Sequence, residues 1–460
     1  MLFNSFQFLF FLLLVLLVSA FLSRRYVPLF LLCSSYIFYA SWNLNFVPLL
    51  LGTTVLDFTV CRSLQVNEKV SRRKQLLALS IAGNLGVLAL FKYGVFFWEN
   101  FLSVPYNTLT GQSATFFSIA LPVGISFYTF QSMGHSIDVY RRKFTERIGF
   151  VDFALYVSFF PQLVAGPILR GADFFPQLVR SRAKKCEIWG GLDLILIGFT
   201  KKIVFADNLA IYVDSVFGGL HEYSLIEIVL ASYAFAIQIY CDFSGYTDIA
   251  RGVAKWLGFE IPINFNYPYF SQSITEFWRR WHISLSNWLR DYLYFPLGGN
   301  RQGLSRTYRN LIITMLLGGF WHGAAWNFLC WGGYHGVLLV IAHRYWNMEE
   351  TSHLLKRVMR IVITFNMVSV GWFLFRIESL QELSRLTLNF GIGFKDLNIV
   401  FSTLCLMLLF FFIHLGRYWS GVKLIDKRRP LVCQVLIIAF NLFIVLLCGA
   451  PSSSFIYFQF

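Results

Sequence analysis

Two histidines stand in settings where an imidazole could do chemistry. His322 lies in the run Gly318 to Trp326, inside an apolar stretch that is expected to span a membrane, where an ionisable side chain indicates function. In a helix, Gly318, Gly319 and Ala325 are its neighbours, so the imidazole should face open space. A neutral imidazole can take the proton of a hydroxyl group. Alternatively, the small residues serve close helix packing, and His322 forms a bond across that contact.

The second histidine, His282, belongs to a dense aromatic and basic stretch, residues 277–291. Read as one helix, this stretch has an apolar face at positions 278, 281, 282, 285, 288, 289 and 292. It predicts the floor of a site whose basic side chains, Arg279, Arg280 and Arg290, meet an anionic substrate. The alternative is an interfacial amphipathic helix at the level of the lipid headgroups.

Two carboxylates, Asp242 and Asp248, lie at or near the expected membrane depth. Asp248 precedes Arg251 by three residues, which favours an ion pair. Asp242 has no basic partner nearby in sequence, so it either orients a catalytic group or makes a simple hydrogen bond. His335, one span beyond His322, is the reserve candidate for the base. No histidine spacing indicates a metal site.

The elements that position these residues are membrane segments. Of the 460 residues, 57% are apolar and 14% are charged, well below the roughly 25% charged residues of soluble domains. The formal net charge of +15 comes from short basic segments between apolar runs, which is the positive-inside pattern and not a nucleic-acid surface. We expect an all-α polytopic protein forming one integral domain over residues 1–460.

The basic segments also predict a topology. About eleven spans satisfy it, with both termini extracytoplasmic. The first run, Phe6 to Leu22, has no preceding positive charge and is expected to stay as a helix. The further segments that we expect to span the membrane are residues 27–42, 45–60, 76–92, 117–138, 311–327, 328–342, 358–376, 398–416 and 432–449. The apolar but interrupted segments 150–178, 187–206 and 253–300 are expected to be re-entrant elements that line a central funnel.

Three strings of residues resemble motifs of the membrane-bound O-acyltransferase superfamily, and the resemblance extends along essentially the whole chain. They are residues 242–248, 277–284 and 320–326, and they are most similar to the bacterial alginate O-acetyltransferase branch, whose relatives modify peptidoglycan, cell-wall glycans and teichoic acid. The resemblance implies that His322 is catalytic and that His282 is a second site residue. It also implies a ring of tilted helices around a thin centre, with the donor entering from the cytoplasm.

The C-terminal string, Phe455 to Phe460, resembles a Phe-x-Tyr-Phe-x-Phe tail of systems that pass acyl groups to an extracytoplasmic transferase. This resemblance implies that Tyr457 carries the acyl group as an ester. The predicted topology places the tail, residues 451–460, outside the membrane, as that role requires. The alternative is an aromatic belt at the membrane surface.

The expected function is therefore O-acetylation of an extracytoplasmic polysaccharide by an enzyme of the bacterial inner membrane. Acetyl-CoA, a substrate and not a bound cofactor, docks on the cytoplasmic side near residues 279–309, and His322 activates the acceptor hydroxyl with help from His282. An SGNH-type partner places the acetyl group on an alginate-like polymer, peptidoglycan or a cell-wall glycan. Substrate-binding side chains are assigned as Arg279, Arg280, Trp281, Arg290, Asp242 and Trp321.

Two other classes of function remain open from the residues alone. Broken helices and intramembrane acids also suit a transporter or flippase for a lipid-linked saccharide. That alternative lacks the expected symmetry between half-chains and gives the setting of His322 no role. A non-catalytic scaffold leaves both histidines unexplained.

Overall fold

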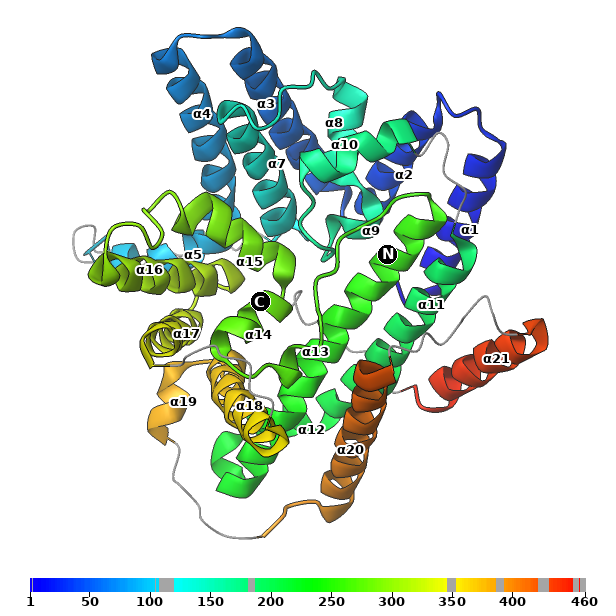
Figure 1. Ribbon diagram of the computed structural model, residues 1–460, viewed down its shortest axis with the longest axis vertical. Coiled ribbons are helices and arrows are strands. Elements are labelled where there is room, and N and C mark those ends of the chain that lie inside the picture. Colours follow the sequence, from blue (N-terminus) through cyan, green and yellow to red (C-terminus); the bar gives the residue numbers. More distant parts are fainter. Residues whose placement is uncertain are drawn as a thin grey trace. The chain divides into compact units, whose positions relative to one another are not determined.

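The described part of the chain is helical. A computed structural model describes residues 1, 3–103, 105–106, 120–180, 187–345, 353–385, 393–420, 430–449 and 455. Within these ranges the regular elements are helices and no strand occurs (Figure 1), which confirms the all-α prediction. The chain divides into two compact units, residues 1–187 with 253–261, and residues 188–252 with 262–460.

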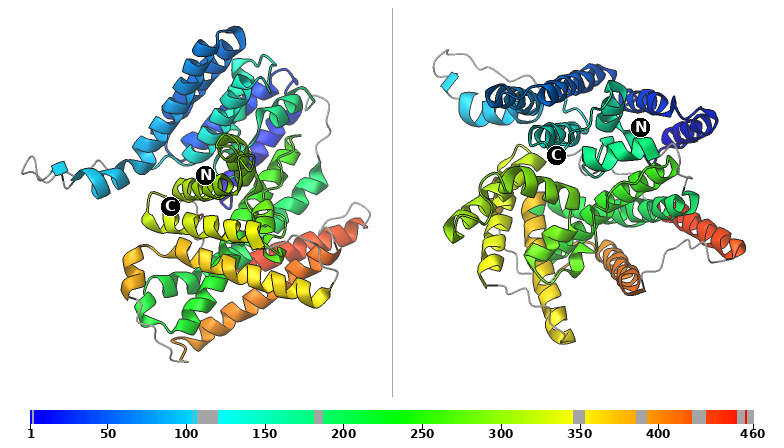
Figure 2. Two further views of the ribbon diagram at one scale, coloured as in Figure 1. Left: turned by 60° about the vertical axis from the view of Figure 1, so that its left-hand side comes forward. Right: turned by 45° about the horizontal axis from the view of Figure 1, so that its top comes forward.

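The first unit contains a bundle of three long helices, α3, α4 and α7, which pack side by side (Figure 2). The helices of this unit are α1 Phe6–Phe21, α2 Val27–Ala40, α3 Val47–Val66, α4 Val70–Leu88, α5 Gly94–Phe97, α7 Ile125–Tyr140, α8 Phe150–Ser158, α9 Phe160–Leu163 and α10 Gly171–Arg180. Asp57 of α3 is buried and accepts hydrogen bonds from Asn84 at 2.8 Å and from Ser80 and Ser132. One buried carboxylate thus ties the three helices together, because each donor satisfies part of its charge.

The second unit carries both candidate histidines. Its helices are α11 Ile188–Phe199, α12 Asp207–Phe217, α13 Leu225–Trp256, whose last residues belong to the first unit, α14 Ile274–Arg280, α15 Ile283–Leu289, α16 Leu304–His322, α17 Trp326–Tyr345, α18 Leu354–Arg376, α19 Leu380–Arg385, α20 Leu397–Ser420 and α21 Leu431–Leu447. A π-helical turn, Thr200–Ala206, joins α11 to α12. The core of this unit is aromatic and includes the buried Trp281, Trp331 and Trp372.

Five helical stretches among the described residues are long and apolar enough to cross a membrane. They are Leu44–Val66, Val70–Leu102, Leu225–Trp256, Leu354–Arg376 and Leu397–Trp419, and α1, α2 and α21 are shorter apolar helices. This pattern is that of a multi-pass membrane protein. The ring of eleven spans and the sidedness of the termini stay predictions.

Two of the three interrupted segments are interrupted as expected. Residues 150–178 break after Ser158 and again after Leu163, and residues 253–300 contain only short helices beyond the end of α13. The interruption expected in residues 187–206 does not occur, because α11 continues through the π-helical turn into α12. The two lysines of that turn are paired with acids, which removes the reason to expect a break there. The re-entrant role of all three segments stays a prediction.

Helices α11 and α13 approach each other through glycines. A Cβ atom on Gly198 would lie 2.6 Å from the carbonyl oxygen of Gly245, and one on Gly252 would lie 2.6 Å from that of Gly191. No side chain larger than hydrogen fits these positions without moving the backbones apart. Small residues therefore set the distance between the two helices, as they do in other membrane helix pairs.

The glycine contact predicts a selective loss of stability. Gly245→Ala should lower the free energy of unfolding by about 1–3 kcal/mol, since its Cβ atom would meet the carbonyl oxygen of Gly198 at 2.8 Å. Gly416→Ala in α20 is the matched control, because nothing lies within 4 Å of its added Cβ atom. Thermal unfolding of the purified variants in detergent measures both. Equal melting temperatures for the two variants would contradict the close contact.

Candidate active site

The backbone breaks at His282, between α14 and α15. Helix α14 ends at Arg280, Trp281 is extended, and His282 adopts a left-handed conformation with φ of 42° and ψ of 55°. The predicted single helix over residues 277–291 is therefore wrong, and its predicted apolar face does not form. The break sends the two side chains in different directions. Trp281 is buried with its ring centroid 4.8 Å from that of Trp372, whereas His282 lies 4.7 Å from Phe243.

His322 is the last residue of α16, and Gly323 caps the helix with an extended backbone. The predicted span 311–327 thus ends early, and Ala325 does not share a helical face with the histidine. The expected open space is also wrong, because the ring centroids of Trp331 and Phe375 lie 5.2 and 5.3 Å from that of His322. His322 is 7% exposed, so it stands in an aromatic enclosure.

The glycines before His322 serve packing, as the alternative interpretation held. A Cβ atom on Gly319 would collide with the carbonyl oxygen of Phe328 in α17, and one on Gly318 would lie 3.2 Å from the side chain of Leu289. Helices α16 and α17 can therefore pack closely along this seam. The position of His322 at the end of α16 is fixed by this close packing.

Trp321 lies between the two histidines. Its ring centroid is 6.1 Å from that of His282 and 4.9 Å from that of His322. The reserve candidate His335 follows on the other side of Trp331, at 5.0 Å between ring centroids. Residues that are far apart in sequence, from the α14–α15 junction and from α16, α17 and α18, thus meet in one aromatic cluster. We call it the histidine cluster: His282, Trp321, His322, Trp331 and Phe375.

The environment of His282 keeps its imidazole neutral. The junction residue is 1% exposed, and the two helices that flank it have seven residues each, too few to cross a membrane. Burial penalises the imidazolium form and lowers the pKa of His282 to about 3. A neutral imidazole can accept one hydrogen bond and donate another, which suits a group that orients a reacting hydroxyl.

Asp242 has a basic partner forty residues earlier in the chain. Lys202 Nζ lies 2.7 Å from Asp242 Oδ1 and 2.9 Å from Asp207 Oδ1, and all three side chains are buried. Sequence reasoning missed this lysine, although a charged residue in an apolar run is itself a signal. The ion pair holds the position before Phe243, whose ring contacts His282.

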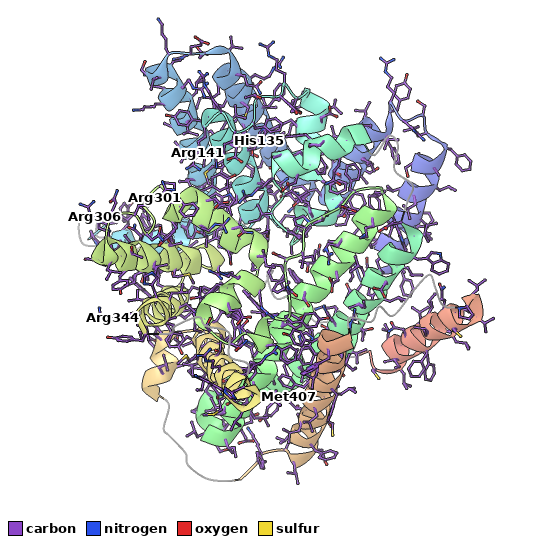
Figure 3. The ribbon with its side chains drawn as sticks, in the orientation of Figure 1. His135, Arg141, Arg301, Arg306, Arg344 and Met407 are labelled. Atoms are coloured by element: carbon purple, nitrogen blue, oxygen red, sulfur yellow. The ribbon has the colours of Figure 1, made fainter. Side chains whose placement is uncertain are left out.

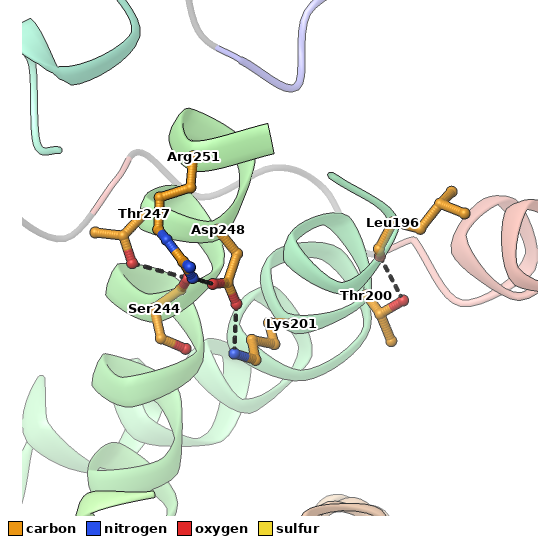
Figure 4. A network of polar contacts seen from close by, with 7 residues as sticks. All are labelled: Leu196, Thr200, Lys201, Ser244, Thr247, Asp248 and Arg251. Carbon is orange, nitrogen blue, oxygen red and sulfur yellow. Dashed lines mark hydrogen bonds and ion pairs between the residues drawn. The ribbon is translucent and has the colours of Figure 1, made fainter. Parts of the chain in front are cut away.

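Asp248 forms the ion pair that its spacing predicted. Arg251 Nη1 lies 3.3 Å and Lys201 Nζ 2.7 Å from its carboxylate (Figure 4). The same view shows the Thr200 hydroxyl donating to the carbonyl oxygen of Leu196 at 2.9 Å. Consecutive lysines of the π-helical turn thus reach two different acids of α13, and Asp248 has a structural role.

The basic side chains assigned to the donor lie at the surface of the second unit or pair locally. Arg279 and Arg290 are exposed, Arg280 pairs with Glu276 at 2.6 Å, and Arg290 pairs with Asp291 at 2.8 Å. Figure 3 shows three further arginines, which lie just before α16, in its first turns and near the end of α17: Arg301, Arg306 and Arg344. A role for any of them in donor binding stays a prediction.

One residue of the tail is described. Phe455 is buried, and its ring centroid lies 4.7 Å from that of Tyr246 and 6.0 Å from that of Phe243. Phe243 also contacts His282, so Phe455 is linked through Phe243 to the histidine cluster. Tyr457 lies outside the described residues.

Comparison with known proteins places the chain among membrane acyltransferases. The model of the membrane-bound O-acyltransferase family matches residues 139–381. The chain is 42% identical to a probable alginate O-acetylase of Pseudomonas aeruginosa over 388 residues, which cover 84% of the chain and 74% of that protein. It is 36% identical to a peptidoglycan O-acetyltransferase of Helicobacter pylori, with 83% and 78% covered. A teichoic acid D-alanyltransferase of Bacillus subtilis is 28% identical over 55% of the chain and 68% of that protein.

The buried lysine predicts an asymmetry between two neighbouring residues. Lys202→Met removes the cation that lies between the buried carboxylates of Asp207 and Asp242, at a cost of about 3–5 kcal/mol in the free energy of unfolding. Lys201→Met, the matched control, leaves Asp248 paired with Arg251 and is partly exposed, so it should cost less than about 1 kcal/mol. The amount of folded protein recovered in detergent measures the difference.

Adding Asp242→Asn to Lys202→Met should recover part of the folded protein, because it removes one of the two buried negative charges that Lys202 pairs with. Equal yields for Lys202→Met and Lys201→Met would show that Lys202 does not hold the acids.

Proposed function

Because the chain belongs to the membrane-bound O-acyltransferase family, we propose that it moves acetyl groups from cytoplasmic acetyl-CoA across the membrane for O-acetylation of an extracytoplasmic polysaccharide. The predicted family resemblance is confirmed, and the protein is a multi-pass membrane O-acyltransferase. The relatives named for alginate and peptidoglycan support these two polymers as acceptor classes. Family membership leaves the transporter and scaffold interpretations without support.

The observation that carries this proposal is the histidine cluster. Two buried imidazoles, one at the α14–α15 junction and one at the end of α16, both lie beside one indole, that of Trp321. An acyl transfer from a thioester to a hydroxyl needs a base for the hydroxyl proton and a site from which water is excluded. The rings around His322 provide a dry enclosure of that kind.

The proposed reaction assigns one role to each histidine. His322 takes the proton of the acceptor hydroxyl as its oxygen attacks the thioester carbonyl carbon. The new C–O bond forms and the C–S bond breaks, and the proton passes from His322 to the departing thiolate. His282, held neutral by burial, orients the reacting groups by a hydrogen bond.

A second part of the proposal concerns the way out of the site. Tyr457 is the acceptor hydroxyl of the first transfer and carries the acetyl group as a phenyl ester to an SGNH-type partner outside the membrane. The support is that Phe455, two residues earlier, packs against Tyr246 and Phe243, and Phe243 in turn contacts His282. Both termini are proposed to be extracytoplasmic and the membrane to be the bacterial inner membrane.

Removal of the base tests the site. His322→Ala should reduce acetylation of the envelope polymer by about 10²-fold or more, because it removes the imidazole that takes the hydroxyl proton. His282→Ala should also reduce acetylation severely. The control is His221→Ala, whose side chain is 69% exposed and should have no effect. Alkaline release of polymer-bound acetate, normalised to protein level by immunoblotting, measures all three. Wild-type acetylation in His322→Ala would exclude it as the base.

The proposed role of Tyr457 is tested by removing its phenol oxygen. Tyr457→Phe keeps the aromatic ring, so an interfacial anchor would survive, but phenylalanine offers no nucleophile. We expect loss of polymer acetylation at normal protein level, and Tyr345→Phe, an exposed tyrosine, should have no effect. In cells without the extracytoplasmic partner, mass spectrometry of the C-terminal peptide should find an acetyl ester on Tyr457. Normal polymer acetylation in Tyr457→Phe would reduce the tail to an anchor.

A further inference from the structure

The break at His282 is bound to a separate segment of the chain by Asn264. The backbone N–H of Ile283 donates to the carbonyl oxygen of Asn264 at 3.0 Å. The backbone N–H and the hydroxyl of Ser284 both donate to Asn264 Oδ1 at 3.0 Å. Two residues further on, the N–H of Asn266 donates to the carbonyl oxygen of Arg280 at 2.9 Å. The loop segment 264–266 therefore holds the chain on both sides of His282.

From these contacts we infer that Asn264 is a positioning residue for the acyl transfer, which keeps the imidazole of His282 at the reacting groups. This inference rests on the proposed function, because it assumes that His282 serves the reaction. Asn264 itself contacts the backbone that carries His282 and acts through it.

The reason for this arrangement lies in the conflict between capping and chemistry at residue 282. The N-cap position of a helix favours Asn, Asp, Ser or Thr, whose side chains accept a hydrogen bond from the first turn. In α14 this rule is met by Ser273, which accepts from the N–H of Glu276 at 3.1 Å. In α15 the N-cap position is His282, which makes no capping bond with its side chain. Asn264 supplies the missing acceptor from elsewhere in the chain.

Backbone strain makes the external cap necessary. His282 has a φ of 42°. Residues other than glycine rarely adopt this conformation, and they keep it only where surrounding contacts fix it. Asn264 is 1% exposed, so water cannot replace its amide oxygen as an acceptor. Without that oxygen, the N–H and the hydroxyl of Ser284 lose their acceptor, and the backbone at His282 can relax toward a right-handed conformation that turns the imidazole away from Trp321.

The amide nitrogen of Asn264 is not part of the cap. Nδ2 is buried and has no hydrogen-bond partner among the described residues. Only the oxygen is needed at this position, so aspartate, which is as good an N-cap as asparagine, preserves the acceptor. This difference separates loss of the cap from any general effect of changing a buried residue.

The experiment compares two caps of the same region. Asn264→Ala removes the cap of α15, and Ser273→Ala, the matched control, removes the cap of α14, which does not hold His282. Acetyl transfer from radiolabelled acetyl-CoA to polysaccharide, by the purified protein together with its extracytoplasmic partner, is measured as kcat and KM, and the melting temperature is measured on the protein alone. Asn264→Ala should lower kcat by roughly 10- to 100-fold with KM for acetyl-CoA nearly unchanged, since a displaced group costs rate more than binding. Ser273→Ala should lower the melting temperature by a similar amount but retain wild-type kcat.

Two further variants complete the test. Asn264→Asp should return kcat to within about fivefold of wild type. In a His282→Ala background, Asn264→Ala should cause no further loss of kcat, because residues that act through one group are not additive. Equal kcat in Asn264→Ala and Ser273→Ala, or an additive loss in the double variant, would overturn the inference. An unchanged kcat in His282→Ala alone would instead overturn the role given to His282 in the proposed function.

Discussion

The left-handed backbone conformation of His282 is the constraint on which the candidate site depends. It interrupts the chain between two short helices, α14 and α15. This turn sends Trp281 into the core against Trp372 and leaves the imidazole beside Phe243 and Trp321. In a continuous helix the two side chains would project only about 100° apart around the helix axis. Trp281 therefore packs in the core while its neighbour, His282, reaches the cluster that contains His322. This arrangement depends on hydrogen bonds from a segment outside both helices.

Helix α13 shows how charges are kept inside a membrane protein of this kind. It is 32 residues long, and it is long and apolar enough to cross a membrane although it contains Asp242, Asp248 and Arg251. Each acid is paired with a lysine of one π-helical turn, at 2.7 Å in both cases. A π-helical turn widens the helix locally. Pairing leaves the hydrophobic surface of α13 free for packing, and it fixes Phe243, the residue of α13 that contacts His282.

The sequence alone predicted the family and the helical fold class better than the local geometry of the candidate site. An imidazole in an apolar, glycine-rich run marks His322, and prolines mark the breaks in residues 150–178, because these signals are local. The turn at His282 has no such signal, since neither glycine nor proline stands there and the contact with Asn264 exists only in the folded chain. The pairing of Lys202 with Asp242 was missed because forty residues separate them, although a charged residue in an apolar run is itself a signal. The enclosure of His322 by Trp331 and Phe375 likewise comes from other helices.

A structure of the protein with an acetyl-CoA analogue, in which a methylene group replaces the thioester sulfur, is the most direct test of the histidine cluster as the place of acyl transfer. The analogue keeps the carbonyl group but cannot release a thiol, so it should remain bound. Electron cryo-microscopy should find the carbonyl carbon of the analogue within about 3–4 Å of the position of the acceptor hydroxyl beside His322. Both imidazoles should line the same chamber. A bound analogue whose carbonyl lies away from His282 and His322, in protein that still transfers acetyl groups, would contradict the assignment.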